Sequence, residues 1–335
     1  MQYFKLSFLV TAICIVCAFL WSGVYGVFIV LILGILEVSL SFDNAVVNAS
    51  ILKKMDEVWQ YYFLTWGILI AVFGMRLLFP IVIVAAATGL SFMGVTEMAL
   101  NDTAAYAEHL TASHIQISTF GGMFLLMLFF SFMFDPEKDV HWRAIEAKLA
   151  LWGKLESIEV IMALSILLVL QGLLAEAERL EALIAGVFGV VLYVLVDSLA
   201  TLFEDEDVGK MASNGVKKAG MMSFLYLEVL DASFSFDGVI GAFAITQDVV
   251  IIMLGLAIGA MFVRSLTIML VRKGTLDEYI FLEHGAHYAI GILSVIMLVS
   301  TRTHVPEVVT GLTGVLLIAY SVYSSIQYNK ASGNK

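Results

Sequence analysis

Acidic and hydroxyl side chains recur in two short segments that lie within apolar stretches of the chain. Residues 37–44 read Glu-Val-Ser-Leu-Ser-Phe-Asp-Asn, and residues 231–238 read Asp-Ala-Ser-Phe-Ser-Phe-Asp-Gly. Aligned without gaps, the segments share two serines, the final Phe-Asp pair and an acid six residues before that Asp. Carboxylate, hydroxyl and amide oxygens are the ligands that hard divalent cations prefer. The two segments therefore predict an internal duplication that carries a cation site.

On a regular helix, each segment would place a stripe of oxygen-bearing side chains on one face. The first stripe is Glu37, Ser41, Asn44 and Asn48, and the second is Glu228, Asp231, Ser235 and Gly238. Asp43 and Asp237 would lie about 100° around from the last motif residues, on the flank of each stripe. A local break at Ser-Phe-Asp would turn both carboxylates and the freed carbonyl groups toward one point, and the sequence leaves that break undecided.

Buried acids in a membrane need compensation of their charge. Insertion of the five acids of the motif helices into the bilayer would cost on the order of 10 kcal/mol or more of free energy if they stayed unpaired. These acids are Glu37, Asp43, Glu228, Asp231 and Asp237. A bound cation, protons, or the intramembrane residues Arg76 and Arg264 could compensate them. An ion pair of Arg76 with Asp43 is the structural alternative, and Arg264 could extend to the end of its helix.

Further polar side chains could form a proton path or support the site. Glu156 and Glu159 are spaced to share a face of one helix, and Asp197 falls late in the next. Glu283 and His287, spaced at i and i+4, could bind a metal or relay protons. A hydrated helix start is the alternative for this last pair.

The composition indicates what must position these side chains. The chain has 335 residues, of which 61% are hydrophobic and 14% charged. A transmembrane helix needs about 20 residues, which predicts an all-α, polytopic membrane bundle of about ten helices in a lipid bilayer. The expected spans are 6–22, 27–51, 60–87, 118–134, 155–173, 182–203, 220–246, 249–272, 283–301 and 306–325. The first span could instead be a signal peptide.

The loop charges predict the orientation. Nearly all loop lysines and arginines fall on one side of these spans, and only Arg179 and Arg302 fall on the other. The positive-inside rule then places both termini in the cytoplasm and the chain in the inner, cytoplasmic membrane. The two motif helices run in opposite directions, and an inverted repeat with polar residues near the midplane is typical of secondary transporters.

One transmembrane domain is expected over residues 1–335. Its parts are an extra helix at 1–25, a first repeat at 26–135, connecting helices with an acidic cytoplasmic loop at 136–219, and a second, inverted repeat at 220–325. The outer loop 88–117 contains no Lys or Arg. The acidic run 204–207 could be a solvated helix end or could attract cations.

Several classes are excluded or disfavoured. The formal net charge of −11 argues against nucleic acid as a partner. No phosphate-binding Gly-x-x-x-x-Gly-Lys loop occurs, so direct ATP coupling is not expected and we do not predict an enzyme. A non-transporting membrane scaffold or metal sensor and, more remotely, an intramembrane aspartyl protease are the alternatives. A homo-oligomer is compatible with the sequence.

The repeated Ser-Phe-Asp-Asn and Ser-Phe-Asp-Gly elements resemble the TerC family, named for tellurium resistance and related to the LysE-type transporter superfamily. The likeness extends over about residues 30–325, but the His-bearing ninth helix and the 88–117 loop depart from it. The resemblance implies export of a divalent metal, with manganese favoured over calcium, magnesium or zinc. Because direct ATP coupling is not expected, the proton gradient is the expected driving force. The ligands that it implies are Glu37, Asp43, Asn44, Asp231 and Asp237, while Gly238 offers only backbone and a role of Glu228 stays open.

Overall fold

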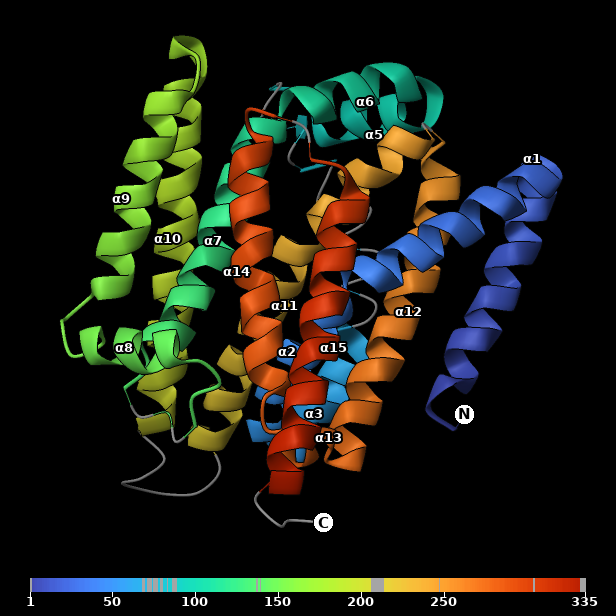
Figure 1. Cartoon of the computed structure of the whole chain (residues 1–335). Coiled ribbons are helices and arrows are strands. Elements are labelled where there is room, and N and C mark those ends of the chain that lie inside the picture. The colour runs from blue at the N-terminus through green and yellow to red at the C-terminus, as the bar shows by residue number, and fades with distance from the viewer. Residues whose placement is uncertain are drawn as a thin grey trace. The chain divides into compact units, whose positions relative to one another are not determined.

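Helices make up every regular element of the residues that can be described. The computed structural model describes residues 2–67, 89–136, 138, 140–205, 214–246, 248–303 and 305–331, with isolated positions 70, 74, 78, 81, 82, 84 and 85. No strand occurs among these residues (Figure 1). The predicted all-α class is therefore confirmed.

The chain divides into two units, each built from two stretches of sequence. The first unit comprises residues 1–114 and 211–275, and the second unit comprises residues 115–210 and 276–335. The first contains η1 (Gln2–Phe4), α1 (Lys5–Leu40), α2 (Phe42–Lys54), α3 (Glu57–Tyr62), the π-helical η2 (Phe63–Gly67), α5 (Phe92–Asn101), α6 (Thr103–Ala112), α11 (Asn214–Ile245) and α12 (Val249–Lys273). The second contains α7 (His114–Phe134), α8 (Ala144–Trp152), α9 (Ile158–Leu173), α10 (Glu176–Asp205), α13 (Thr275–Glu278), α14 (Leu282–Ser300) and α15 (Glu307–Ala331), where α7 and α13 start at the boundary.

Long apolar helices indicate a multi-pass membrane protein. Among the described residues, six helices have the length and composition to cross a bilayer. They are Lys5–Leu40, His114–Phe134, Glu176–Ser198, Val249–Lys273, Leu282–Ser300 and Val309–Ala331, and Ile158–Leu173 is a shorter apolar helix. Large apolar side chains are exposed on several of them, as on α1, where Leu20 is 79% exposed. Such faces suit lipid tails rather than water.

The helical stretch that begins with α1 is broken at two places, at Ser22–Gly23 and at Ser41. Ser22 and Gly23 leave the helical conformation, and Gly23 has a φ of 65°, which glycine adopts at little steric cost. This kink lies between the two predicted spans 6–22 and 27–51. The second interruption is a single turn residue, Ser41, between α1 and α2. The first motif copy is thus broken at Ser-Phe-Asp, whereas α11 runs without interruption through the second copy.

Small residues allow α1 to pack closely on α12. Gly255 and Gly259 form a Gly-x-x-x-Gly pair on α12, a spacing that brings helix backbones together in membranes. A Cβ on Gly255 would lie 2.5 Å from Cβ of Leu33, and a Cβ on Gly259 would overlap the side chain of Glu37. Near the start of α1, the Ser7 hydroxyl donates to the Met261 carbonyl at 2.7 Å. The two glycine contacts fix the part of α1 that carries Glu37, and the Ser7 bond fixes its start.

Well-defined caps set the ends of α12. The Asp248 carboxylate accepts hydrogen bonds from the backbone N–H groups of Val250 and Ile251 at 3.0 and 3.2 Å, as an N-cap does. Gly274 ends the helix in the left-handed conformation with φ 63°. The observed helix, Val249–Lys273, matches the predicted span 249–272 within one residue.

The segment 88–117, predicted as a long loop, contains two short helices, α5 and α6. Ser91 and Asp102 cap them by accepting from the N–H groups of Gly94 and Ala105 at 3.2 and 3.1 Å. Most of the predicted span 60–87 falls outside the described residues, beyond α3 and η2.

Candidate functional site

Acids and amides from three helices are buried together in the first unit. We call this set the acid cluster, and it consists of Glu37 on α1, Asp43, Asn44 and Asn48 on α2, and Glu228 and Asp231 on α11. Each of these six side chains is at most 8% exposed. The Asn44 side-chain Nδ2 donates to Oδ1 of Asp231 at 2.7 Å. The structure thus joins the two motif copies directly.

The helix break at Ser41 explains the placement of Asp43. Because α2 starts at Phe42, Asp43 falls in its first turn, where helical N–H groups have no partner within the helix. The Asp43 carboxylate accepts from the backbone N–H of Asn44 at 3.0 Å. Across the break, the Ser41 hydroxyl donates to Oε1 of Glu37 at 3.2 Å. The local break therefore holds both acids of the first copy in fixed positions.

Two glycines make room for the carboxylates of the cluster. A Cβ at Gly238 would lie 2.5 Å from Oε2 of Glu37, and a Cβ at Gly67 would lie 2.6 Å from Oε1 of Glu228. Gly238 stands where Asn44 stands in the first motif copy. The side chain that the second copy lacks would occupy the space of the Glu37 carboxylate, which explains this departure between the copies.

The acid cluster has more hydrogen-bond acceptors than donors. Neither carboxylate oxygen of Glu228 has a hydrogen-bond partner among the described residues, and the same holds for Oδ1 of Asn44 and of Asn48. Buried polar atoms are nearly always hydrogen-bonded in folded proteins. These four acceptor oxygens therefore require a donor or a cation that the described residues do not supply.

The described residues contain no ready-made cluster of three or more His, Cys, Asp or Glu side chains that could hold a metal ion. Asp237 lies in α11, but its side chain and that of Ser235 fall outside the description, as does Arg76 altogether. The predicted approach of Asp43 to Asp237 accordingly stays a prediction. Of the predicted site, the structure brings together the residues of the first motif copy with Glu228 and Asp231.

Other predicted polar residues lie elsewhere. Glu156 and Asp197 are exposed, and Glu156 precedes α9 in a turn that ends at Ser157 with φ 57°, so it does not share a helix face with Glu159. Arg264 is half-buried on α12 and lines a cavity described below. The acidic run 204–207 lies where side chains are not described.

A second buried polar cluster occurs in the second unit, and the sequence analysis missed it. Nδ1 of His284 lies 2.9 Å from Oε2 of Glu146, which also accepts from the backbone N–H of Trp142 at 2.8 Å. Glu146 is fully buried although it lies on the short helix α8 in a charged segment. The signal in the sequence was His284, which follows Glu283. Its partner, Glu146, is 138 residues away in the chain and could not be found from a local pattern.

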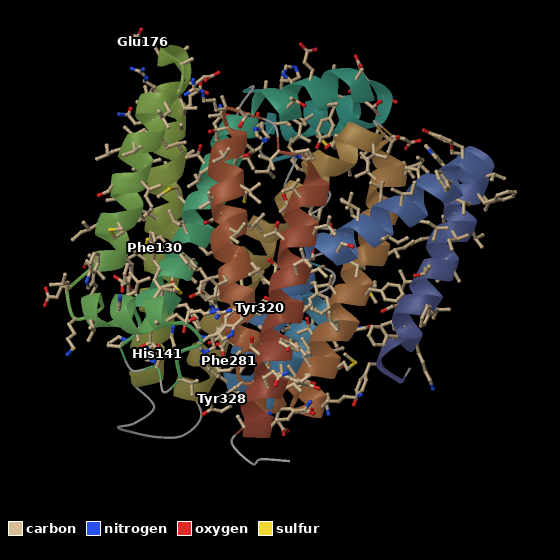
Figure 2. The ribbon with its side chains drawn as sticks, in the orientation of Figure 1. Phe130, His141, Glu176, Phe281, Tyr320 and Tyr328 are labelled. Carbon is tan, nitrogen blue, oxygen red and sulfur yellow. The ribbon has the colours of Figure 1, made fainter. Side chains whose placement is uncertain are left out.

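The predicted pairing of Glu283 with His287 takes another form. Nδ1 of His287 bonds the backbone carbonyl of Glu283 at 2.9 Å, and its ring stacks on Phe132 with 3.8 Å between centroids. The Lys138 side chain also contacts Phe132, with Nζ 3.4 Å from the centroid of the ring. Phe281, the residue before α14, contacts the rings of His284 and of Tyr328 on α15, and Tyr320 on α15 contacts Trp142 (Figure 2).

Electrostatics favour the charged form of Glu146. Burial alone would raise the pKa of its carboxyl, but the hydrogen bond from His284, the charge of His284, the Trp142 N–H and the charge of Lys138 together hold this pKa below its ordinary value. A carboxyl whose pKa is lower in the folded protein than in the unfolded chain stabilises the fold at pH values above its ordinary pKa. This contribution is lost as the pH falls through the pKa of the folded state.

We therefore expect an acid-sensitive stability that depends on Glu146. The melting temperature of the detergent-purified protein should fall as the pH is lowered below about 4.5. Glu146→Gln should lower stability at pH 7 by about 1–3 kcal/mol and flatten this acid dependence, because a charge-assisted hydrogen bond is weakened. Glu156→Gln, the same change at an exposed side chain, should leave both unchanged. Parallel pH profiles of the wild-type protein and Glu146→Gln would contradict the assignment.

The fold and the buried side chains define a class, namely an all-helical, multi-pass membrane protein with a carboxylate cluster at a break in a membrane-associated helix. The chain belongs to the family described as protein of unknown function DUF475, whose profile matches residues 42–332. The match includes Asp43, Asn44, Glu228 and Asp231 of the acid cluster. No curated protein and no solved structure matches the chain.

Proposed function

We propose that this protein is a secondary transporter that exports a divalent cation, with manganese favoured, in exchange for protons. The acid cluster, with Asp237, is the proposed substrate site. The observation that carries the proposal is Glu228, a buried carboxylate that has no hydrogen-bond partner on either oxygen among the described residues. A cation or a proton supplies the compensation that such a group requires.

The charge balance of the first unit supports this reading. Glu37, Asp43, Glu228 and Asp231 are buried acids, and Arg264 is the intramembrane base described in the same unit. Desolvating an ionised carboxylate without a partner is unfavourable by several kcal/mol in practice. Two positive charges of a divalent ion offset part of this excess, and protons can offset it when the ion has left.

The donor chemistry favours a hard ion. The cluster offers carboxylate, amide and hydroxyl oxygens and, within the described residues, no thiolate or imidazole. Such sets suit manganese, magnesium or calcium better than zinc or copper. Because ligating carboxylates must be deprotonated, metal binding releases protons, and the site can couple the two ions by competition.

Reciprocal contacts between the motif copies support an inverted repeat. Glu37 of the first copy lies against Gly238 of the second, and Asp231 of the second copy bonds Asn44 of the first. In the gap-free alignment, Glu37 corresponds to Asp231 and Asn44 to Gly238. The acid of each copy thus contacts the last motif residue of the other copy, as expected for two copies related by a two-fold axis. The resemblance of the Ser-Phe-Asp elements to the TerC family supports the same substrate class.

Proteoliposomes provide the direct test. Vesicles that contain the purified full-length chain should accumulate or release Mn²⁺ in response to a pH gradient, with opposite movement of protons reported by an internal dye. Ca²⁺, Mg²⁺ and Zn²⁺ in parallel assign the substrate. Saturable Mn²⁺ binding without flux would favour a metal-sensing scaffold, and neither binding nor flux of any of these ions would refute the proposal.

A further inference from the structure

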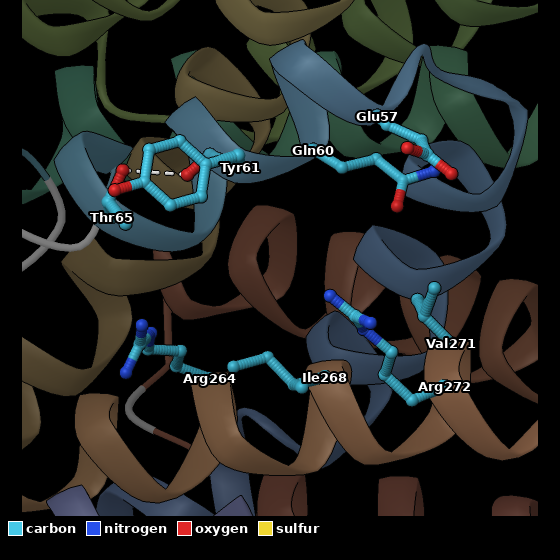
Figure 3. A pocket seen from close by; sticks show the side chains of 8 residues that line it. All are labelled: Glu57, Gln60, Tyr61, Thr65, Arg264, Ile268, Val271 and Arg272. Atoms are coloured by element: carbon cyan, nitrogen blue, oxygen red, sulfur yellow. Dashed lines mark hydrogen bonds between the residues drawn. The ribbon is translucent and has the colours of Figure 1, made fainter.

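A polar cavity of about 650 Å³ lies between two segments of the first unit, and no residue of the acid cluster lines it. One wall is the C-terminal half of α12, and the other is formed by α3 and η2. The side chains that line it are Glu57, Gln60, Tyr61, Thr65, Arg264, Ile268, Val271 and Arg272. Figure 3 shows Arg264 and Arg272 on one wall and the polar residues of α3 and η2 across from them.

The α12 wall has an arginine at each end and apolar groups between them. Arg264 and Arg272 are eight residues apart, which is about 12 Å along a helix. Ile268 and Val271 lie between them and offer an apolar strip. On the opposite wall, Gln60 is held by its hydrogen bond to the Met55 carbonyl at 2.9 Å, and Thr65 by its bond to the Tyr61 carbonyl at 2.6 Å. With Glu57 counted, the lining has one net positive charge.

Two guanidinium groups in one cavity are suited to a phosphate. The planar guanidinium donates paired hydrogen bonds to phosphate oxygens, and arginine is therefore a preferred phosphate ligand. Arg272 lies in the last turn of a helix that is long and apolar enough to span a bilayer, so its depth matches that of lipid headgroups. A free phosphate ion would use the arginines but not the apolar strip, whereas a lipid would use both.

We propose that this cavity binds the phosphate of an anionic phospholipid, with Arg264 and Arg272 as its ligands. The Tyr61 hydroxyl adds a donor, and Gln60 and Glu57 accept from headgroup hydroxyls. The apolar strip at Ile268 and Val271 contacts the start of an acyl chain. Nothing in this assignment depends on metal transport, so it and the proposed transport function can fail separately.

Lipid binding to the purified full-length protein in neutral detergent tests the assignment. Native mass spectrometry with phosphatidylglycerol should show a bound lipid that phosphatidylcholine does not replace. Arg264→Gln combined with Arg272→Gln should weaken this binding about tenfold or more, because two charge-assisted contacts are lost. Lys273→Gln removes the same charge from the next residue, outside the cavity lining, and should change the affinity less than twofold.

Three outcomes would overturn the assignment. Equal binding of phosphatidylcholine would exclude recognition of an anionic headgroup. Equal losses from Lys273→Gln and Arg272→Gln would show a diffuse basic surface instead of a site. Displacement of the lipid by millimolar inorganic phosphate would overturn the choice of lipid over the free ion. Arg272 is exposed, so Arg272→Gln alone remains informative even where the Arg264 variant fails to fold.

Discussion

Asp43→Asn and Glu228→Gln should each lower the affinity of the purified protein for Mn²⁺ by about a hundredfold or more, since loss of even an outer-shell partner costs ten- to a hundredfold. Both changes keep the size of the side chain and remove one negative charge. Glu228 is the more informative position, because its two oxygens have no hydrogen-bond partner among the described residues. An amide there no longer demands a cation, so the variant should fold at least as well as the wild-type protein.

Calorimetry in two buffers with different ionisation enthalpies measures both the affinity and the number of protons released. Each variant should release fewer protons on Mn²⁺ binding than the wild-type protein. Glu146→Gln is the matched control, since it makes the same change at a fully buried carboxylate of the second unit. Unaltered Mn²⁺ affinity in both Asp43→Asn and Glu228→Gln would show that neither residue is a ligand.

Gly259→Ala should destabilise the protein by about 1–3 kcal/mol and also weaken metal binding. The added methyl group would overlap Cβ and Cγ of Glu37 and would lie 3.2 Å from the Gly34 carbonyl oxygen, so α1 and α12 must separate or shift. A shift moves Glu37 relative to the rest of the acid cluster. The effect on binding therefore accompanies the effect on stability, although Gly259 itself has no side chain to offer a ligand.

Gly172→Ala is the control for this prediction. Gly172 also lies in a helix, α9, but a Cβ there would meet no atom within 4 Å. Since alanine favours a helix by up to about 1 kcal/mol over glycine, the control should be neutral or slightly stabilising. Thermal unfolding in detergent, followed by circular dichroism, compares the two variants. Equal stability of Gly259→Ala and Gly172→Ala would contradict the close packing of α1 on α12.

The proposed exchange of a metal ion for protons requires a site that is stable in two charge states. The asymmetry between the motif copies suits this requirement, because the first copy is broken at Ser41 and the second is a continuous helix. In the first copy, the Asp43 carboxylate accepts from the Asn44 N–H and the Glu37 carboxylate accepts from the Ser41 hydroxyl. Glu228 lacks such donors among the described residues and is the group that we expect to gain the proton when the metal leaves.

The sequence by itself determined the class of protein and the main polar residues of the candidate site. An apolar fraction of 61% indicates lipid as the surrounding solvent, and helices satisfy every backbone hydrogen bond there without help from distant segments. The caps and glycines that end α12 act over a few residues, so its bounds could be read directly. The acids of the motifs stand out for the same local reason, since a carboxylate within an apolar run is costly wherever the helix packs.

Tertiary structure decided which of these groups meet, because contacts between distant segments depend on packing that no local pattern encodes. The bond of Asn44 to Asp231 joins residues 187 positions apart, and that of Glu146 to His284 joins residues 138 apart. The helix break at Ser41 occurs in one motif copy only, although both copies carry the same Ser-Phe-Asp, so surrounding contacts and not local propensity select it. By sequence, Gly238 offers only backbone to a ligand, yet its lack of a side chain is what admits the Glu37 carboxylate. Only the approach of α1 to α11 creates this role.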